Sequence, residues 1–169
     1  MLQLSQSLLN RSIVSLRTGG RVGRVLAMVI NPTNLKIEGF YCQNEADHKK
    51  TSILLSQDIR DIIDMGIVVD DHDALTDPSE LVRLKHLLDL QFTVIGKPVY
   101  TESRARLGKV NDIAVDVESM LIQKLYVGQS VFKSFTGGTL NIDRSQIVGV
   151  TDTRITVQDL TQKAPAAMG

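Results

Sequence analysis

The sequence predicts a mostly β protein made of two small antiparallel β-barrels joined by a short amphipathic helix. Two observations carry this prediction: a segment of alternating apolar and polar residues that occurs twice, and a leucine pattern of helical spacing between the two copies. With 169 residues the chain is long enough for one ordinary domain or two very small ones, and the repeat favours two. Halves of about 70 residues are marginally stable alone, so we expect them to pack on each other.

The repeated segment is clearest in residues 107–127. Its side chains alternate with the two-residue period of a strand, pass a polar turn, and resume as a second β-rich run, so the segment predicts a hairpin. Residues 22–42 align with it without a gap. The aligned pairs include Gly23 with Gly108 and Tyr41 with Tyr126. The chain is therefore predicted to be a tandem repeat.

The first domain is predicted to span residues 1–75 and to contain five strands. Turn residues separate these strands, because glycine tolerates positive φ at Gly19 and Gly20 and Pro32 withdraws a ladder donor. The strand candidates are residues 13–16, 22–31, 35–42, 52–55 and 66–69.

Residues 76–90 are predicted to form a helical linker. Asp77 is a capping acid, Pro78 suits the first helical position, and Glu80 follows the cap by three residues. Leucines then recur on one helical face, which we call the leucine stripe: Leu81, Leu84, Leu87 and Leu88. We expect the stripe to be buried between the barrels. The alternative is an exposed stripe that serves as a docking surface for a partner.

The second domain, residues 91–160, repeats the order of the first. Its last two strand candidates, 147–150 and 154–157, align with the end of the first half only if three extra residues lie in the loop around 132–138. Insertions of this kind belong in surface loops. The remaining residues, 161–169, are small and polar, and we expect them to form a disordered tail.

The composition excludes several kinds of partner and site. Lysine plus arginine and aspartate plus glutamate both number 19, so the formal net charge of zero provides no global attraction for nucleic acid or an anionic membrane. The single cysteine, Cys42, excludes an internal disulfide, and its apolar strand position predicts a small core residue. No run approaches the roughly 20 apolar residues of a membrane span. We expect a cytoplasmic protein.

The sequence lacks the common motifs of catalysis and cofactor binding. It has no nucleophile elbow, phosphate loop, dinucleotide fingerprint or zinc-protease helix. The acidic run 70–73, which contains His72, is a candidate cation site, but a solvated turn at a strand end explains it better. We therefore expect no catalytic residues, no cofactor and no bound metal, and we predict that the protein is not an enzyme.

The one polar feature that repeats is basic. Cations flank the equivalent glycines of the two hairpins: Arg21 and Arg24 in the first copy, and Arg106 and Lys109 in the second. Exposed together on a hairpin, such cations are a candidate phosphate-binding rim. The alternative interpretation is a solvated turn whose charges protect strand ends from edge pairing. No aromatic residues are interleaved for base stacking, which favours the second interpretation.

The strand residues Leu107–Asp116, followed by Ile122 and 125–127, resemble the glycine-lysine-valine strand motif of the PRC-barrel family. The first copy matches the motif less well, because Ala27 and Asn31 stand where the second copy has aspartates. The resemblance extends over about residues 10–160 and implies two tandem PRC-barrels. Members that resemble this chain include a domain of the photosynthetic reaction-centre H subunit and the C-terminal half of a ribosome-maturation factor. None of these roles depends on catalytic residues in the barrel.

From the residues and the resemblance we expect a non-enzymatic binding or adaptor module that mediates protein–protein interaction. The alternative is an RNA- or ribosome-associated factor, for which the basic residues would be the contact. The identity of the partner and the oligomeric state are left open by the sequence.

Overall fold

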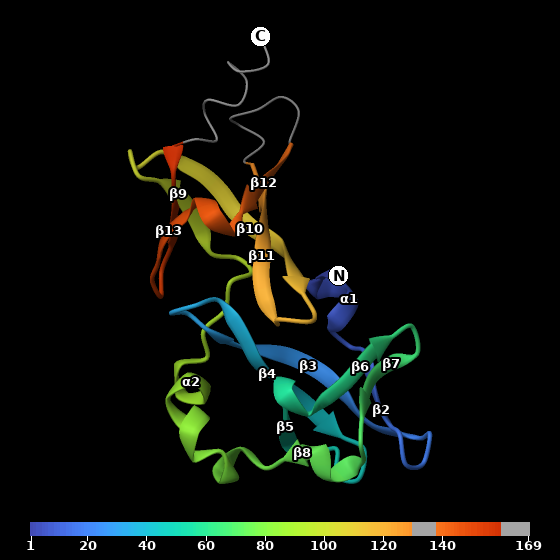
Figure 1. Cartoon of the computed structure of the whole chain (residues 1–169). Helices are drawn as coiled ribbons and strands as arrows, with labels where there is room; N and C mark the ends of the chain where they lie inside the picture. Colours follow the sequence, from blue (N-terminus) through green and yellow to red (C-terminus); the bar gives the residue numbers. More distant parts are fainter. Residues whose placement is uncertain (130–137, 160–169) are drawn as a thin grey trace. The chain divides into compact units, whose positions relative to one another are not determined.

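The computed structural model describes residues 1–129 and 138–159 of the chain (Figure 1). Its contacts divide the chain into two compact units. We call Ser5–Phe92 with Val117–Leu121 the N-unit, and Met1–Leu4 with Thr93–Asp116 and the chain from Ile122 onward the C-unit. The tail predicted at 161–169 and, apart from Gly138, the insertion predicted around 132–138 lie outside the described residues.

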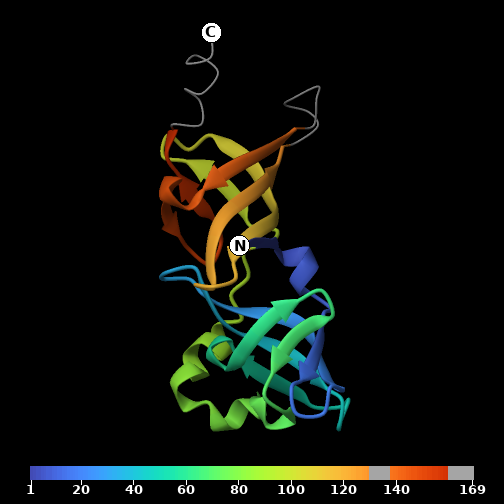
Figure 2. The same ribbon diagram turned by 45° about the vertical axis from the view of Figure 1, so that its right-hand side comes forward.

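The N-unit is a curved sheet with one short helix before it (Figure 2). Its strands pair in the order β6-β7-β2-β3-β4-β5-β8. The elements are α1 (Ser5–Leu8), β2 (Ser12–Ser15), β3 (Arg21–Asn31), β4 (Lys36–Asn44), β5 (Thr51–Leu55), the 3-10 turn η1 (Ser56–Asp58), β6 (Ile59–Ile63), β7 (Gly66–Val69), η2 (His72–Ala74) and β8 (Leu75–Thr76). Burial alternates along β2, whereas all four residues of β7 are buried. The core of the unit includes Ile13, Val25, Ile37, Phe40, Leu54 and Ile67.

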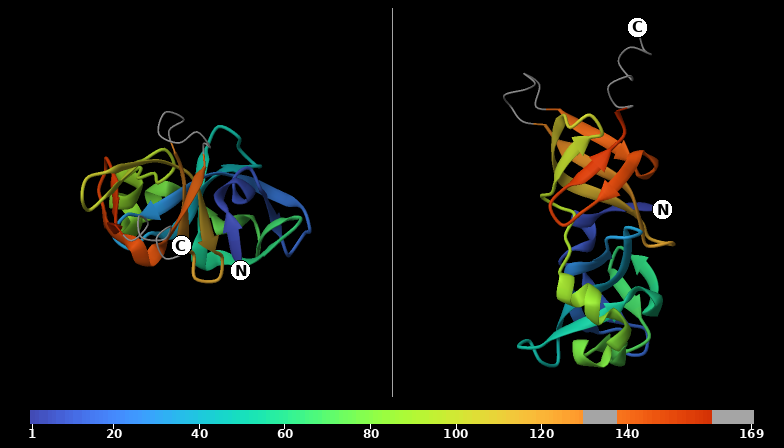
Figure 3. Two further views of the ribbon diagram at one scale, coloured as in Figure 1. Left: turned by 90° about the horizontal axis from the view of Figure 1, so that it is seen from above. Right: turned by 90° about the vertical axis from the view of Figure 1, so that its left-hand side faces the viewer.

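The C-unit repeats this arrangement, and the right-hand view of Figure 3 shows its strands crossing one another. The order is β13-β14-β9-β10-β11-β12, with β1 also paired to β10. The strands are β1 (Leu2–Leu4), β9 (Pro98–Thr101), β10 (Arg106–Asp116), β11 (Leu121–Gly128), β12 (Thr139–Asp143), β13 (Ile147–Val150) and β14 (Ile155–Val157), and the 3-10 turn η5 (Arg144–Gln146) precedes β13.

The pairing registers of the two units correspond residue by residue. In the N-unit β2 lies parallel to β7 with Ile13 opposite Ile67, and in the C-unit β9 lies parallel to β14 with Val99 opposite Ile155. β3 is the antiparallel partner of β2, and one of its residues, between Arg21 and Gly23, has no partner on β2. β10 is the antiparallel partner of β9, and its residue between Arg106 and Gly108 likewise has no partner on β9. The glycine of each copy therefore sits directly after a β-bulge, which re-aims the following side chains.

The prediction of a mostly β protein is confirmed, but the prediction of two antiparallel barrels is wrong in two respects. Each unit contains one parallel pair, because η1 and η5 join successive strands without a hairpin, so the last strand returns to the first in the same direction. In addition, the hydrogen-bonded strands of the N-unit run in an open order from β6 to β8, and those of the C-unit run in an open order from β13 to β12. No closed barrel is found among the described residues.

The linker belongs to the N-unit and is less regular than predicted. Instead of one helix over 76–90, it contains η3 (Pro78–Glu80), η4 (Val82–Leu84) and the short helix α2 (Lys85–Leu90). The predicted capping role of Asp77 is confirmed, because its carboxylate accepts a hydrogen bond from the Ser79 N–H at 2.9 Å. The linker then covers the outer face of β3, β4 and β5.

The leucine stripe packs on that face of the N-unit. Leu87, only 4% exposed, is buried with Val29 and Ile53, and the cluster is completed by the half-buried side chains of Tyr41, Leu55, Leu81, Leu84 and Leu88. Every residue of this cluster lies in the N-unit. The structure thus gives the stripe a packing role within one unit, where the sequence predicted burial between two barrels.

Gly23 and Gly108 both lie where a strand backbone approaches another closely. A Cβ on Gly23 would lie 2.6 Å from the carbonyl oxygen of Gln43, and a Cβ on Gly108 would overlap the carbonyl oxygen of Gly128, the residue equivalent to Gln43. Gly108 also has φ +147°, a conformation that side chains disfavour. A close backbone approach is therefore common to the equivalent glycines of the two copies.

Candidate functional site

The basic residues of the N-unit are engaged in local contacts. Arg21 forms an ion pair with Glu45 at 2.9 Å, and the arginine lowers the pKa of that carboxyl mainly through its hydrogen bond. The Arg24 guanidinium donates to the Gln43 side chain at 3.2 Å, while its Nε is buried without a hydrogen-bond partner among the described residues. The contacts of Arg21 and Arg24 therefore link the start of β3 to the end of β4.

The basic residues of the C-unit are more available. The bulge between Arg106 and Gly108 places both Arg106 and Lys109 on the solvent-facing side of β10, where both are exposed. Neither forms an ion pair or a side-chain hydrogen bond with the residues that the structure describes. The four residues predicted to form one rim belong to different units, Arg21 and Arg24 to the N-unit and Arg106 and Lys109 to the C-unit.

Asp70 and Asp71 of the acidic run 70–73 form hydrogen bonds and ion pairs with neighbouring strands and turns. Asp70 accepts two hydrogen bonds from the Arg60 guanidinium, and Asp71 accepts from the Ser15 hydroxyl at 3.1 Å and pairs with Arg17 at 3.2 Å. The C-unit has a matching contact, because the Ser103 hydroxyl donates to Asp159 at 2.9 Å. Within residues 1–129 and 138–159 no group of three or more metal-ligating side chains is found.

The contacts of Asp71 make the stability of the N-unit depend on pH. The N–H of His72, then Ser15 and Arg17, lower the Asp71 pKa from 3.8 to about 2. A carboxyl whose pKa is lower in the folded state than in the unfolded state stabilises the fold at pH values above its unfolded pKa. This stabilisation is lost as the pH falls through the folded pKa. We expect Asp71→Asn to lower the melting temperature at pH 6, with the difference from wild type shrinking between about pH 4 and pH 2. Circular dichroism melts across this range test this expectation, with the exposed Asp73→Asn as control.

Cys42 is fully buried on β4, as the sequence predicted. Burial raises the pKa of its thiol to about 12, so the sulfur stays protonated near neutral pH. The thiol also donates to the carbonyl oxygen of Phe40 at 3.4 Å. It is a core residue and not a nucleophile.

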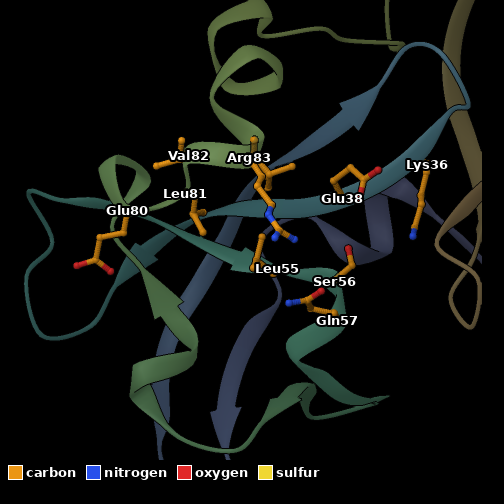
Figure 4. Close-up of a pocket in the computed structure, with 10 residues that line it drawn as sticks. Lys36, Glu38, Leu55, Ser56, Gln57, Glu80, Leu81, Val82 and Arg83 are labelled. Carbon is orange, nitrogen blue, oxygen red and sulfur yellow. The ribbon is translucent and has the colours of Figure 1, made fainter.

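A cavity of about 460 Å³ opens in the N-unit where the linker passes over β4 and β5 (Figure 4). Its walls come from β4, from the β5–η1 junction, and from η3 and η4. The lining residues are Lys36, Glu38, Leu55, Ser56, Gln57, Glu80, Leu81, Val82, Arg83 and Leu84. Three of the aliphatic residues also belong to the cluster under the leucine stripe, so the floor of the cavity is anchored to the core.

The charged residues around the cavity are not neutralised by one another. Lys36, Glu38, Glu80 and Arg83 form no ion pair with any described residue, although two of them are cationic and two anionic. In Figure 4 the Arg83 guanidinium extends over Leu55 into the cavity, whereas Glu80 points away from it. The Ser56 hydroxyl donates to the Ile37 carbonyl oxygen at 2.7 Å, which fixes one polar group at the cavity wall. Val82 adds an apolar side chain that is 79% exposed.

Of these residues, the sequence pattern indicated only Leu81 and Leu84. The signal available for the others was weak: Lys36 and Glu38 have the two-residue spacing that puts both on one face of a strand. The partner wall lies more than forty residues away in the chain, and no local pattern specifies how the linker crosses these strands.

Comparison with known proteins assigns the C-terminal part of the chain to a family. Residues 91–162 match the PRC-barrel domain family. The chain thus contains one PRC-barrel domain, in the region that carries Gly108, Lys109 and Val110 of the predicted motif. No curated protein matches the chain. The N-terminal half has no assigned family, and the cavity lies there, outside the PRC-barrel match.

In the part of the chain that the structure describes, no helix is both long enough and apolar enough to cross a membrane.

Proposed function

We propose that this protein is a non-enzymatic adaptor that binds a protein partner, and that the cavity of the N-unit is one of its contacts. The observation that carries this proposal is the combination of an aliphatic floor with unpaired charges of both signs around it. A polypeptide supplies the complement of such a surface, since one segment can bury apolar side chains and place acidic and basic groups around them. The exposed Val82 would be buried on binding.

We also propose that the N-unit is a second PRC-barrel-like domain. Support comes from the shared strand order, the equivalent parallel pairs β2/β7 and β9/β14, and the bulge that precedes Gly23 as it precedes Gly108. The departures at Ala27 and Asn31 from the motif of the second copy explain why a sequence comparison would match one half alone.

The alternative function, association with RNA or the ribosome, rests on Arg106 and Lys109. They are exposed on one face of the PRC-barrel domain without an ion pair to any described residue, as a phosphate contact requires. The overall charge of zero makes any such contact local, so it would weaken with increasing salt.

The adaptor proposal is tested by Val82→Asp. A carboxylate in place of the exposed valine should change the free energy of unfolding by about 0.5 kcal/mol or less, but weaken partner binding by roughly tenfold or more. The measurement is quantitative capture of cross-linked partners from native lysate, with and without ribonuclease. Leu90→Asp is the matched control, because Leu90 is 50% exposed on the same linker and does not line the cavity.

Three outcomes separate the functions. Capture that falls for Val82→Asp and not for Leu90→Asp supports the adaptor site. Equal capture by both variants and the wild type removes the cavity from the interface. Capture that depends on intact RNA, and that is lost on Arg106→Glu with Lys109→Glu, favours the alternative function.

A further inference from the structure

Two successive 3-10 turns hold Arg83 at the rim of the N-unit cavity. In η3 the Leu81 N–H donates to the Pro78 carbonyl oxygen at 3.1 Å, and the Leu84 N–H then donates to the Leu81 carbonyl oxygen at 3.2 Å. Residues three apart lie on the same side of a 3-10 turn, so Leu81 and Leu84 both pack in the cluster under the leucine stripe. The two leucines anchor the turn, and the side chain of Arg83 is left outside the core.

The Arg83 guanidinium lies over apolar surface and has no charged partner in its own unit. Every residue of the N-unit is described, and Arg83 forms no ion pair or side-chain hydrogen bond with any of them. Figure 4 shows the guanidinium above the half-buried Leu55. Its N–H donors form a planar fork that matches the two oxygens of a carboxylate. Because Leu55 excludes water from one side, a pair formed here is stronger than one on an open surface.

The charges that face the cavity are unbalanced. In Figure 4 the Glu38 carboxylate extends away from the Arg83 guanidinium, toward the side where Lys36 lies, and Glu80 points out of the cavity. The cations Lys36 and Arg83 are therefore opposed by Glu38 alone, which leaves an excess of one positive charge. A single carboxylate balances this excess. A phosphate group, with about −1.5 to −2 charges at neutral pH, would overcompensate it and be repelled by Glu38.

The polar wall of the cavity indicates what carries the carboxylate. The Ser56 hydroxyl donates its proton to the Ile37 carbonyl oxygen at 2.7 Å, so its oxygen is left to accept a hydrogen bond. A ligand that satisfies both walls presents a donor to Ser56 and a carboxylate to Arg83. A polypeptide segment has both, since its backbone supplies N–H donors, whereas a simple aliphatic acid has no N–H group. The aliphatic floor adds contact for an apolar neighbour of the acidic residue.

We propose that the cavity selects a protein segment in which an aspartate or glutamate next to an aliphatic residue places its carboxylate on the Arg83 guanidinium. The aliphatic residue packs on the cavity floor, and the charge-assisted hydrogen bonds to Arg83 provide selectivity for the acidic residue. This inference rests on the proposed adaptor function and names the chemistry that its cavity recognises.

The test uses pools of short capped peptides that differ only in the central residue. The central residue is acidic (aspartate or glutamate) in one pool, the matching amide in the second and phosphoserine in the third, and the flanking positions are mixtures of alanine, valine and leucine. Mass spectrometry quantifies the peptides that the immobilised full chain retains. The wild type should retain the acidic pool over the amide pool by roughly fivefold or more, with no enrichment of phosphoserine. Arg83→Gln should retain the acidic and amide pools equally.

Lys85→Gln is the matched control, because it removes a cation two residues away on the same linker. The Lys85 ammonium pairs with Asp89 at 2.8 Å, its side chain is 74% exposed, and it does not line the cavity. This variant should keep the wild-type preference for the acidic pool. Both variants should melt close to the wild type, since exposed side chains contribute little to stability. Circular dichroism melts check that the fold is intact.

Equal retention of the acidic and amide pools by the wild type, or enrichment of phosphoserine, would overturn the inference. So would a preference that survives Arg83→Gln or disappears in Lys85→Gln. If the wild type holds the acidic and amide pools equally and Val82→Asp releases both, the cavity remains a peptide site and only the carboxylate assignment fails. If the wild type retains no pool above the level of Val82→Asp, the cavity is not a peptide contact, and the proposed adaptor site fails together with this inference.

Discussion

Replacing Gly108 with valine is expected to unfold the PRC-barrel domain at temperatures where the wild type remains folded. The valine Cβ would occupy the space of the Gly128 carbonyl oxygen, so β10 must move away from β11 at the bulge. The φ of +147° adds a conformational penalty of about 1–3 kcal/mol before any pairing is lost. Because 1 kcal/mol shifts the melting temperature of a domain this small by about 4–8 °C, we expect a decrease of roughly 10 °C or more.

The same unit offers a matched control. Gly149, on β13, has no atom within 4 Å of the position that a Cβ would take and no positive φ, so Gly149→Val should melt close to the wild type. Gly23→Val should lie between the two, since its Cβ meets the Gln43 carbonyl oxygen at 2.6 Å in an ordinary backbone conformation. Thermal unfolding followed by circular dichroism ranks the three variants. Equal melting of Gly108→Val and Gly149→Val would show that the strands relax freely at the bulge.

The glycines illustrate what the sequence specifies well. The repeat places Gly23 and Gly108 at equivalent points, and alternation around them predicts which side chains are buried, because a strand has a period of two residues. Chain direction is not encoded in that period. The parallel pairs β2/β7 and β9/β14 depend on the turns η1 and η5, which join successive strands without a hairpin. This is why the prediction that every strand pair is antiparallel was wrong.

The candidate site was predicted only in part. The four basic residues are where the repeat puts them, but the ion pair of Arg21 with Glu45 joins β3 to the residue after β4, and sequence spacing does not fix such a contact. The cavity was missed because it depends on the path of η3 and η4 over distant strands. The leucine stripe was found from its spacing, whereas its packing surface, Val29 and Ile53, became apparent only in three dimensions.

Changing Leu84 and Leu87 together to serine is expected to destabilise the N-unit strongly. Leu87 is buried against Val29 and Ile53, and truncating a buried leucine costs about 2–5 kcal/mol, to which a buried hydroxyl adds. Leu84 is half-buried in the same cluster and contributes less. The corresponding control is Leu90→Ser on α2, where the side chain is 50% exposed and substitution should change the free energy of unfolding by about 0.5 kcal/mol or less.

Hydrogen exchange resolves where this destabilisation falls. Since every side chain that packs in the cluster lies in the N-unit, protection should decrease in β3, β4 and β5 and remain in β10 and β11. Equal loss in β10 and β11 would mean that the stripe stabilises both units, as the sequence predicted. Wild-type protection everywhere, combined with loss of a partner, would instead make the stripe a docking surface. The low exposure of Leu87 argues for the first result, because a side chain already buried on β3 and β5 has little surface left to offer a partner.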